Sequence, residues 1–257
     1  MPKISIITIN YNNLVGLKRT LTSVINQTWD EFEFIVVDGG STDGSVEFIE
    51  SKSLNIDCWL SEADNGIYNA MNKGIKVSTG EYLLFLNSGD ELYDLTILEK
   101  NNKYIHTEDL IYFDIFMVYH DKSEIFQYPE LLSYKTFLEG SIGHPTTFIK
   151  RTLFNKVGFY DENLKIVSDW KFFMMATVKY NCSSKKISTI LSKYYMDGIS
   201  SIDIDCVNEE REKVLKECFY EYYRLLELEL FLKNIKQSKT IKFLEKLGLL
   251  KFIDKIN

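Results

Sequence analysis

The sequence contains little proline, few histidines and no long apolar segment. Only 3 prolines occur among 257 residues, so no proline-rich hinge or linker divides the chain. No apolar run reaches the length of a membrane span, and Met1-Pro2-Lys3 leads directly into a strand pattern instead of a signal-peptide core. The four cysteines form no Cys-x-x-Cys pair, which argues against a zinc site and against a disulfide framework. We therefore expect a cytoplasmic protein with reduced thiols.

The charge and the aromatic content narrow the class further. A formal net charge of -7 argues against a nucleic-acid-binding protein, which usually carries a basic domain, but leaves a nucleotide ligand open. Aromatic residues make up 14% of the chain and hydrophobic residues 45%, which argues against disorder. The length suits one large domain, or one domain with an extension.

Predicted strands and helices alternate in the first hundred residues. Residues 4–9, 32–37, 58–60 and 83–86 are short apolar runs that indicate strands. Apolar residues at helical spacing lie between them, and Ser41 or Thr42 is placed to cap the second of these helices. This alternation predicts an α/β fold with a mostly parallel central sheet flanked by helices.

The second half has a different pattern. Strands are predicted at 110–119, 125–128, 146–150, 187–191 and 194–196, with a helix at about 170–180. From residue 205 onward only helix signals remain. We therefore expect a domain at 1–205, divided into halves at 1–100 and 101–205, and a helical C-terminal extension at 206–257.

Polar side chains end the first four predicted strands. Asn10 and Tyr11 follow the first strand, and Asp38, Asp64 and Asp90 follow the next three. In a parallel sheet these ends lie at one edge, where ligands of α/β proteins bind. Asp38 could then bind a base or a ribose, Tyr11 could stack on a base, and Asp90 could hold a divalent cation. The alternatives are a turn acid for Asp38, a packing aromatic for Tyr11 and a polar turn for 87–90.

Four segments occur in a recognisable order. They are residues 8–12, 37–44, 61–74 and 85–90, and together they closely resemble family 2 glycosyltransferases of the GT-A fold, of the type that builds bacterial surface polysaccharides. The resemblance covers roughly residues 3 to 200. It implies a nucleotide-sugar-binding α/β half fused to an acceptor-side half.

The resemblance also implies a set of donor-binding residues. They are Thr8, Asn10, Tyr11, Asp38, Asp64, Asn72, Lys73, Asn87, Ser88 and Gly89. Residues 87–90 take the place of the family's metal-binding Asp-x-Asp motif, but Asn87 and Gly89 stand where many members carry acids. Only Asp90 keeps a carboxylate, so a Mg or Mn ion would take most of its ligands from the sugar diphosphate and water.

Transfer of the sugar with inversion needs a base for the acceptor hydroxyl. Residues 167–172 resemble the family segment that carries the catalytic aspartate, and this resemblance makes Asp169 the expected base. The alternative is that Ser168 or Asp169 caps the following helix. His144 and Trp170 are expected near the acceptor or the phosphates, although His144 could equally be a turn histidine satisfied by backbone groups.

These features predict a metal-assisted, inverting glycosyltransferase. It would move a sugar from a nucleoside-diphosphate sugar, with a UDP-sugar favoured, to a saccharide or lipid-linked saccharide. One alternative is a subunit that binds a sugar nucleotide without catalysis. Another is a nucleotidyltransferase with a related α/β core, although residues 10–13 are not the basic, glycine-rich loop that a triphosphate would need.

The C-terminal extension suggests two kinds of contact. Residues 207–236 could form an apolar stripe, and residues 240–255 mix apolar side chains with lysines. A basic amphipathic helix can lie on anionic lipid, which would place the enzyme at the inner face of the cell membrane. The alternative is a helix that packs on the domain or makes a homodimer contact.

Overall fold

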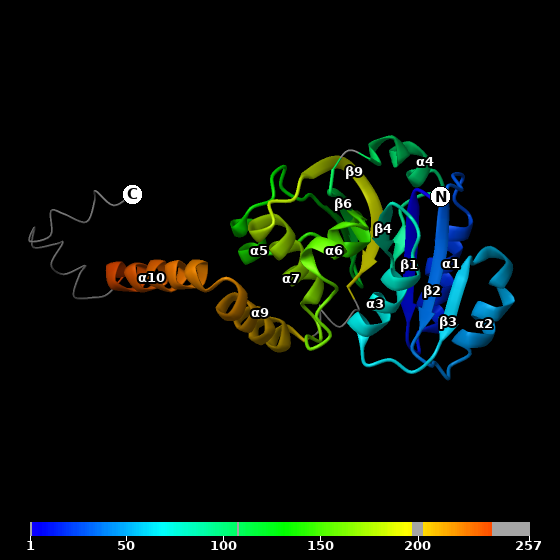
Figure 1. Cartoon of the computed structure of the whole chain (residues 1–257), viewed down its shortest axis with the longest axis horizontal. Coiled ribbons are helices and arrows are strands. Elements are labelled where there is room, and N and C mark those ends of the chain that lie inside the picture. Colours follow the sequence, from blue (N-terminus) through cyan, green and yellow to red (C-terminus); the bar gives the residue numbers. More distant parts are fainter. Residues whose placement is uncertain (1, 107, 197–202, 238–257) are drawn as a thin grey trace, which may run out of the picture. The chain divides into compact units, whose positions relative to one another are not determined.

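A computed structural model gives the fold of residues 2–106, 108–196 and 203–237. The chain divides into two compact units, Met1–Val207 and Asn208–Asn257. Within the first unit, strands and helices alternate in the first hundred residues, as the sequence predicts (Figure 1). The strands of this part are β1 (Ile4–Asn10), β2 (Phe32–Asp38), β3 (Cys58–Ser61), β4 (Tyr82–Phe85) and β5 (Glu91–Leu92). The helices are α1 (Leu14–Ile25), α2 (Ser45–Ser51), α3 (Ile67–Val77) and α4 (Ile97–Asn101), with 3-10 turns η1 (Ser53–Asn55) and η2 (Asn102–Tyr104).

The rest of the first unit mixes longer strands with short helices. Its strands are β6 (Leu110–Val118), β7 (Ser123–Phe126), β8 (Thr147–Lys150) and β9 (Ser184–Tyr195). Its helical segments are α5 (Tyr134–Glu139), η3 (His144–Thr146), α6 (Leu153–Val157), α7 (Ser168–Met174) and the π-helical η4 (Met175–Lys179). The two strands predicted at 187–191 and 194–196 are wrong as separate elements, because β9 is continuous. Ser192 does not break it, since this residue is fully buried and pairs with Ile115 of β6.

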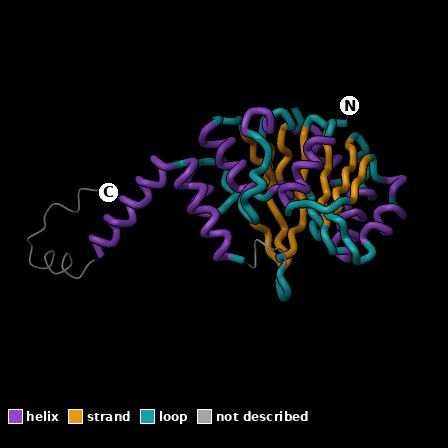
Figure 2. The backbone as a smooth tube through the Cα atoms, turned by 60° about the horizontal axis from the view of Figure 1, so that its bottom comes forward, coloured by secondary structure: helices purple, strands orange, loops and turns teal. Residues whose placement is uncertain are grey.

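In the part of the chain that the structure describes, nine strands form one sheet. The order is β3-β2-β1-β4-β8-β6-β9-β5, and β7 pairs with β6. The first four strands of this order are parallel, while β8 runs antiparallel to both β4 and β6. Figure 2 shows helices on both sides of the strands. The predicted α/β sheet flanked by helices is confirmed, and its first four strands bring their carboxyl ends to one edge.

The apolar core explains why these strands form. Every residue of β1 is buried, as expected for a strand covered on both faces. One cluster of buried side chains joins alternate residues of β1, such as Ile4 and Ile6, to Leu17 and Leu21 of α1. Burial of a large apolar side chain contributes roughly 1.5–3 kcal/mol relative to exposure, so the edge that carries the polar side chains is built on a rigid base.

The helix cap predicted at Ser41 or Thr42 is wrong. Helix α2 begins at Ser45 after Gly44, which has a φ of 93° and offers no side-chain cap. The Ser41 hydroxyl donates instead to the Asp38 carboxylate, at 2.6 Å. To cap α2, the Ser41 oxygen would have to accept a hydrogen bond from an N–H of that helix, but it accepts from Asn10 Nδ2 and from the Asn12 backbone N–H instead. Ser41 therefore binds Asp38 and does not cap α2.

Helix α7 also lacks the cap by Ser168 or Asp169 that was the alternative to a catalytic role for Asp169. Val167 occupies the capping position and makes no side-chain hydrogen bond, so Ser168 and Asp169 lie in the first helical turn. The Ser168 hydroxyl accepts a hydrogen bond from the Asp161 backbone N–H. The Asp169 carboxylate is consequently available for contacts outside its own helix, and a negative charge in this first turn is favourable to the helix dipole.

The second unit contains α10 (Tyr220–Gln237), and α9 (Ile204–Cys218) spans the boundary between the two units. The basic amphipathic segment predicted at 240–255 lies outside the described residues. None of the helices in the described ranges combines the length and the apolar character that crossing a membrane requires.

Candidate active site

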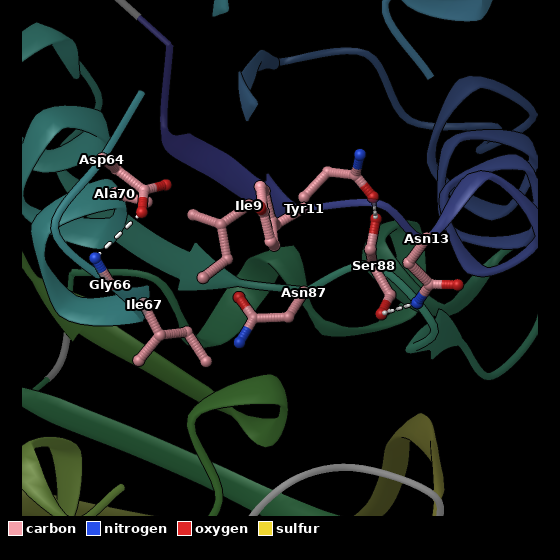
Figure 3. A pocket seen from close by; sticks show the side chains of 10 residues that line it. Ile9, Tyr11, Asn13, Asp64, Gly66, Ile67, Ala70, Asn87 and Ser88 are labelled. Carbon is pink, nitrogen blue, oxygen red and sulfur yellow. Dashed lines mark hydrogen bonds between the residues drawn. The ribbon is translucent and has the colours of Figure 1, made fainter. Parts of the chain in front are cut away.

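A pocket of about 380 Å³ opens at the carboxyl ends of β1 and β4 (Figure 3). This volume lies in the range of small-molecule sites, which is roughly 300–1,000 Å³. Figure 3 shows side chains from β1, from the segment that joins β3 to α3 and from the loop after β4 around one space. The lining residues are Ile9, Asn10, Tyr11, Asn13, Asp64, Gly66, Ile67, Ala70, Asn87 and Ser88. Five of them, Asn10, Tyr11, Asp64, Asn87 and Ser88, are predicted donor-side residues.

The pocket lining is apolar and neutral apart from one acid. Ile9, Ile67 and Ala70 supply apolar surface, and Asp64 is the one charged side chain among the described lining residues. Tyr11 is 66% exposed, so one face of its ring is free to meet a planar group. A ligand with phosphates would therefore find no Lys or Arg in this described lining and would need its countercharge from elsewhere.

Asp38 lies beneath this edge, and its carboxylate is fully buried. It accepts five hydrogen bonds, from Asn10 Nδ2, the hydroxyls of Ser41 and Ser61, and the backbone N–H groups of Gly40 and Ser41. Burial alone would raise the pKa of Asp38, but the hydrogen bonds from Ser41, Asn10 and Ser61 outweigh it and hold the pKa below its ordinary value. The carboxylate thus ties the ends of β1, β2 and β3 together.

Three other predicted donor residues lie outside the pocket lining. The Thr8 hydroxyl donates to the carbonyl of Leu86, at 2.8 Å. Asn72 is buried, and its amide donates to Glu162 and exchanges hydrogen bonds with the Tyr160 backbone. Lys73 forms an ion pair with Glu62, at 2.8 Å, and donates to the Ala63 carbonyl. Each of these groups joins neighbouring elements.

The loop at residues 87–90 is held by α1. Gly89 has a φ of 114°, a conformation that favours glycine, and its N–H donates to the Thr20 hydroxyl. The same hydroxyl lies 2.7 Å from the Asp90 carbonyl and donates to it, and Arg19 donates to the Gly89 carbonyl. The Ser88 hydroxyl donates to Asn10 Oδ1, which joins the loop to β1. Sequence reasoning missed Thr20 and Arg19, because nothing local links α1 to a loop some seventy residues later.

His144 connects this loop to Asp169. Its Nε2 lies 3.1 Å from Asn87 Nδ2, and its Nδ1 lies 3.1 Å from Asp169 Oδ2. Because a carboxylate only accepts, Nδ1 donates the proton to Asp169. The alternative of a turn histidine satisfied by backbone groups does not describe this arrangement. Asp90, which is 6% exposed, also lies near enough to act electrostatically on His144.

Asp169 accepts a second hydrogen bond from across the site. The Tyr68 hydroxyl of α3 lies 2.9 Å from Asp169 Oδ1 and also contacts the carbonyl of Ile166. About 19% of the Asp169 side chain and 18% of the His144 side chain remain exposed, so a substrate hydroxyl can reach the carboxylate. Tyr68 was not predicted, because a buried tyrosine at helical spacing has the same sequence pattern as an ordinary core residue.

The charges of this pair stabilise each other. Burial alone would raise the pKa of Asp169, but His144 and Tyr68 outweigh it and hold the pKa below its ordinary value. Burial would likewise lower the pKa of His144, but the hydrogen bond and charge of Asp169 and the charge of Asp90 raise it above its ordinary value. The carboxylate is therefore ionised at neutral pH, as a general base must be.

Trp170 follows Asp169 but turns into the protein. It is 3% exposed, and its indole N–H donates to the Phe137 carbonyl, at 2.8 Å. This contact packs α7 against α5. Trp170 is therefore placed to set the position of Asp169, whereas contact with an acceptor or a phosphate stays a prediction.

The fold and the pocket define a class of protein. Its ligand site lies at the carboxyl edge of parallel strands, and the Asp169 carboxylate comes to it from α7. The sequence profile described as "Glycosyl transferase family 2" matches residues 5–168. The chain belongs to this family, and it is a glycosyltransferase with a GT-A fold.

Two relatives that match over most of their length are also named glycosyltransferases. A PGL/p-HBAD biosynthesis glycosyltransferase of Mycobacterium bovis (strain BCG / Pasteur 1173P2) is 29% identical over 212 residues, which is 79% of this chain and 81% of the relative. An uncharacterised glycosyltransferase of Mycobacterium tuberculosis (strain CDC 1551 / Oshkosh) is 30% identical over 216 residues, or 78% of each chain.

Solved structures share the fold at lower identity. S. aureus TarS in complex with UDP has a TM-score of 0.65 and 23% identity, over 84% of this chain and 65% of that one. The mannosyltransferase PcManGT from Pyrobaculum calidifontis, in complex with GDP-Man and Mn2+, has a TM-score of 0.62 and 15% identity. It covers 87% of this chain and 64% of that one, so the chain spans a little under two thirds of each.

Proposed function

We propose that this chain is an inverting glycosyltransferase that takes its sugar from a nucleoside-diphosphate sugar, with a UDP-sugar favoured. The observation that carries the proposal is the path from the donor-side loop to the base. Asn87 lines the pocket and contacts His144, and His144 holds Asp169. Binding of UDP by TarS and of GDP-Man by PcManGT supports a ligand of this class.

The reaction balances with the residues present. The acceptor oxygen forms a bond to C1 of the sugar as the bond from C1 to the diphosphate oxygen breaks, and the electron pair leaves with the nucleoside diphosphate. The acceptor proton passes to Asp169. A base positioned in this way contributes about 10²–10⁴-fold to the rate. Attack from the side opposite the leaving group inverts the configuration at C1.

A divalent metal, Mg or Mn, fits the chemistry of the donor side. Asp90 would supply a hard oxygen ligand from the loop whose residues Asn87 and Ser88 line the pocket, and no Lys or Arg lies in the described lining to balance a diphosphate. Within the described ranges no group of three or more His, Cys, Asp and Glu side chains could hold a metal by itself. The ion would thus share its coordination with the diphosphate and water, and it would offset charge on the departing group.

The acceptor is proposed to be a saccharide or lipid-linked saccharide of a surface polysaccharide. The name of the Mycobacterium bovis relative supports a role in building a cell-surface glycoconjugate. Large apolar side chains are exposed on α10, including Leu225, Leu228 and Phe231. They support a contact of this helix with the inner face of the cell membrane or with a second copy. Liposome flotation and solution mass of the full chain, compared with a variant carrying Gln at these three positions, would distinguish the two.

The test of the reaction is release of the nucleoside diphosphate, with water in place of the acceptor hydroxyl. The full chain is incubated with UDP-GlcNAc, UDP-glucose, UDP-galactose, GDP-mannose and a dTDP-sugar, each with Mn2+, with Mg2+ and with chelator. We expect release from one donor, dependent on metal and lost in Asp169→Asn. Thermal shifts with UDP, GDP and dTDP report binding separately, because a ligand that binds the folded state raises its stability. Binding without release in any condition would favour a sugar-nucleotide-binding subunit and overturn the proposal.

A further inference from the structure

The Tyr68 hydroxyl faces two acceptors and has one proton. It lies 2.9 Å from Asp169 Oδ1 and also contacts the carbonyl of Ile166. Tyr68 is 5% exposed, so neither contact is replaced by bulk water. Because a phenol donates only one hydrogen bond, the hydroxyl must choose between the two oxygens. The preferred acceptor can therefore switch if one of the two oxygens changes its protonation state.

Asp169 is the acceptor that changes. Before transfer it is a carboxylate, and the Tyr68 proton is best placed on Oδ1, since a hydrogen bond to an ionised group is the stronger one. After transfer Asp169 carries the proton of the acceptor. Tyr68 can then turn its own proton to the Ile166 carbonyl and accept from the protonated acid. The Tyr68 hydroxyl thus keeps a hydrogen bond to Asp169 in both states, which avoids the cost of about 1–3 kcal/mol that a buried unpaired group would carry.

We propose that Tyr68 is a positioning residue that holds Asp169 in both protonation states, while His144 fixes the second carboxylate oxygen. This inference rests on the proposed function, in which Asp169 is the base. Tyr68 lies in the first turn of α3, and its neighbours Gly66, Ile67 and Ala70 line the pocket. One helix therefore carries a wall of the donor pocket and the clamp on the base.

The groups that face Asp169 come from several elements. They are Tyr68 of α3, His144 of η3, Tyr160 from the segment between α6 and α7, and Asp90, which acts through His144. Tyr160 is the useful comparison. It is 3% exposed, its ring lies 5.6 Å from that of Tyr68, and its hydroxyl has no hydrogen-bond partner among the described residues. It is a buried tyrosine near the same carboxylate that does not hold it.

The experiment compares Tyr68→Phe with Tyr160→Phe in the full chain. The pH dependence of kcat/KM for nucleotide release is measured with the sugar nucleotide that turns over fastest with Mn2+, and Tm is measured in parallel. Loss of the Tyr68 hydrogen bond destabilises the Asp169 carboxylate. The acid limb of the pH profile of kcat/KM should therefore move up by about one pH unit. The rate at neutral pH should fall by about tenfold. Tyr160→Phe should keep the acid limb of the unchanged protein.

A second pair keeps the test decisive if Tyr68→Phe fails to fold. His144→Ala removes the donor to Asp169 Oδ2 and should also raise the acid limb, whereas His144→Gln keeps an N–H donor and should restore part of the shift. Acid limbs that coincide for all variants, with changes in Tm alone, would show that the clamp is only structural and overturn the inference. If Asp169→Asn keeps the full rate, the proposed function itself fails. If Asp169→Asn is inactive and the limbs still coincide, only the inference fails.

Discussion

Two buried carboxylates mark the two regions of the site, and they are held in opposite ways. Asp38, at the end of β2, is fully buried and accepts five hydrogen bonds. Asp169, in the first turn of α7, is held by the side chains of Tyr68 and His144 and keeps 19% of its side chain exposed. The donors to Asp38 are two backbone N–H groups, an amide and two serine hydroxyls, none of which titrates near neutral pH, whereas one of the two side-chain donors to Asp169 is a histidine, which can. A fully buried carboxylate that accepts five hydrogen bonds stabilises the fold. A partly exposed carboxylate with fewer side-chain donors can still exchange a proton.

The largest effect on activity should follow from removing the Asp169 carboxylate. Asp169→Asn keeps the shape of the side chain but cannot take a proton, so the rate of nucleotide release should fall about 10²–10⁴-fold. The free energy of unfolding and the Kd for UDP should change little, because the pocket lining does not include Asp169. Stopped assays with a UDP-sugar and isothermal titration with UDP measure the two quantities. Retention of more than about one tenth of the rate would place the base elsewhere.

The second effect concerns the Asp38 carboxylate and the stability of the fold. Asp38→Asn replaces one acceptor oxygen by an NH2 donor that faces the donors from Asn10, Ser41 and Ser61, and we expect a loss of roughly 3 kcal/mol in the free energy of unfolding. The activity per folded molecule should fall far less than in Asp169→Asn. Chemical denaturation measures the loss. Asp94→Asn is a matched control, since this carboxylate is 38% exposed and should change stability by less than about 1 kcal/mol.

The pH dependence of stability gives a further check on Asp38. Its pKa is lower in the folded protein than the ordinary value of 3.8, so the folded state favours the ionised form. The stabilisation is therefore fully present above 3.8 and is lost as the pH falls through the lower folded value. The difference in unfolding free energy between the unchanged protein and Asp38→Asn should shrink across this acidic range. A difference that stays constant would show that the lost hydrogen bonds do not depend on the charge.

A smaller effect should come from Gly39, between Asp38 and the pocket. A Cβ at this position would lie 2.4 Å from Asp64 Oδ2 and 3.2 Å from Tyr11 Cδ2. Gly39→Ala should thus push the Asp64 carboxylate and the Tyr11 ring from their places and weaken UDP binding about tenfold. The same substitution in an Asp64→Ala background should cost much less, because the closest contact is gone. Equal losses in both backgrounds would contradict this origin.

The sequence indicated the ends of the parallel strands because their signals are local, whereas Asp169 was indicated by the resemblance of its segment. A strand that stops at a polar residue can be recognised within ten residues, and the parallel arrangement then follows from the alternation with helices. The partners of Asp38 could not be predicted in this way. Asn10, Ser41 and Ser61 come from three separate segments, and only the register of β1, β2 and β3 brings them together.

The same reason explains why the clamp on Asp169 was missed. The contacts of Tyr68 and His144 join residues 101 and 25 positions apart, and they depend on how α3 and η3 meet α7. No periodicity in the sequence records that meeting. His144 was found only through the resemblance of its motif, and its role as a bridge required the geometry. Tertiary contacts between distant segments thus set the chemistry that local patterns left open.

The smallest effect should follow from Lys73, which the resemblance assigned to the donor side. Its ammonium group is 2.8 Å from Glu62 and donates to the Ala63 carbonyl, so it faces the loop before α3. Lys73→Met keeps the apolar stem and removes the charge. Because the Glu62 side chain is 61% exposed, the lost ion pair should cost only about 0.5 kcal/mol. The Kd for UDP should stay within about twofold. Glu62→Gln breaks the same ion pair from the other side and should give the same small change in Tm.

A contradicting outcome is that Lys73→Met raises the Kd for UDP about tenfold or more while Glu62→Gln does not. The ammonium group would then turn to the diphosphate on binding, and Lys73 of α3 would supply part of the positive charge that balances the diphosphate.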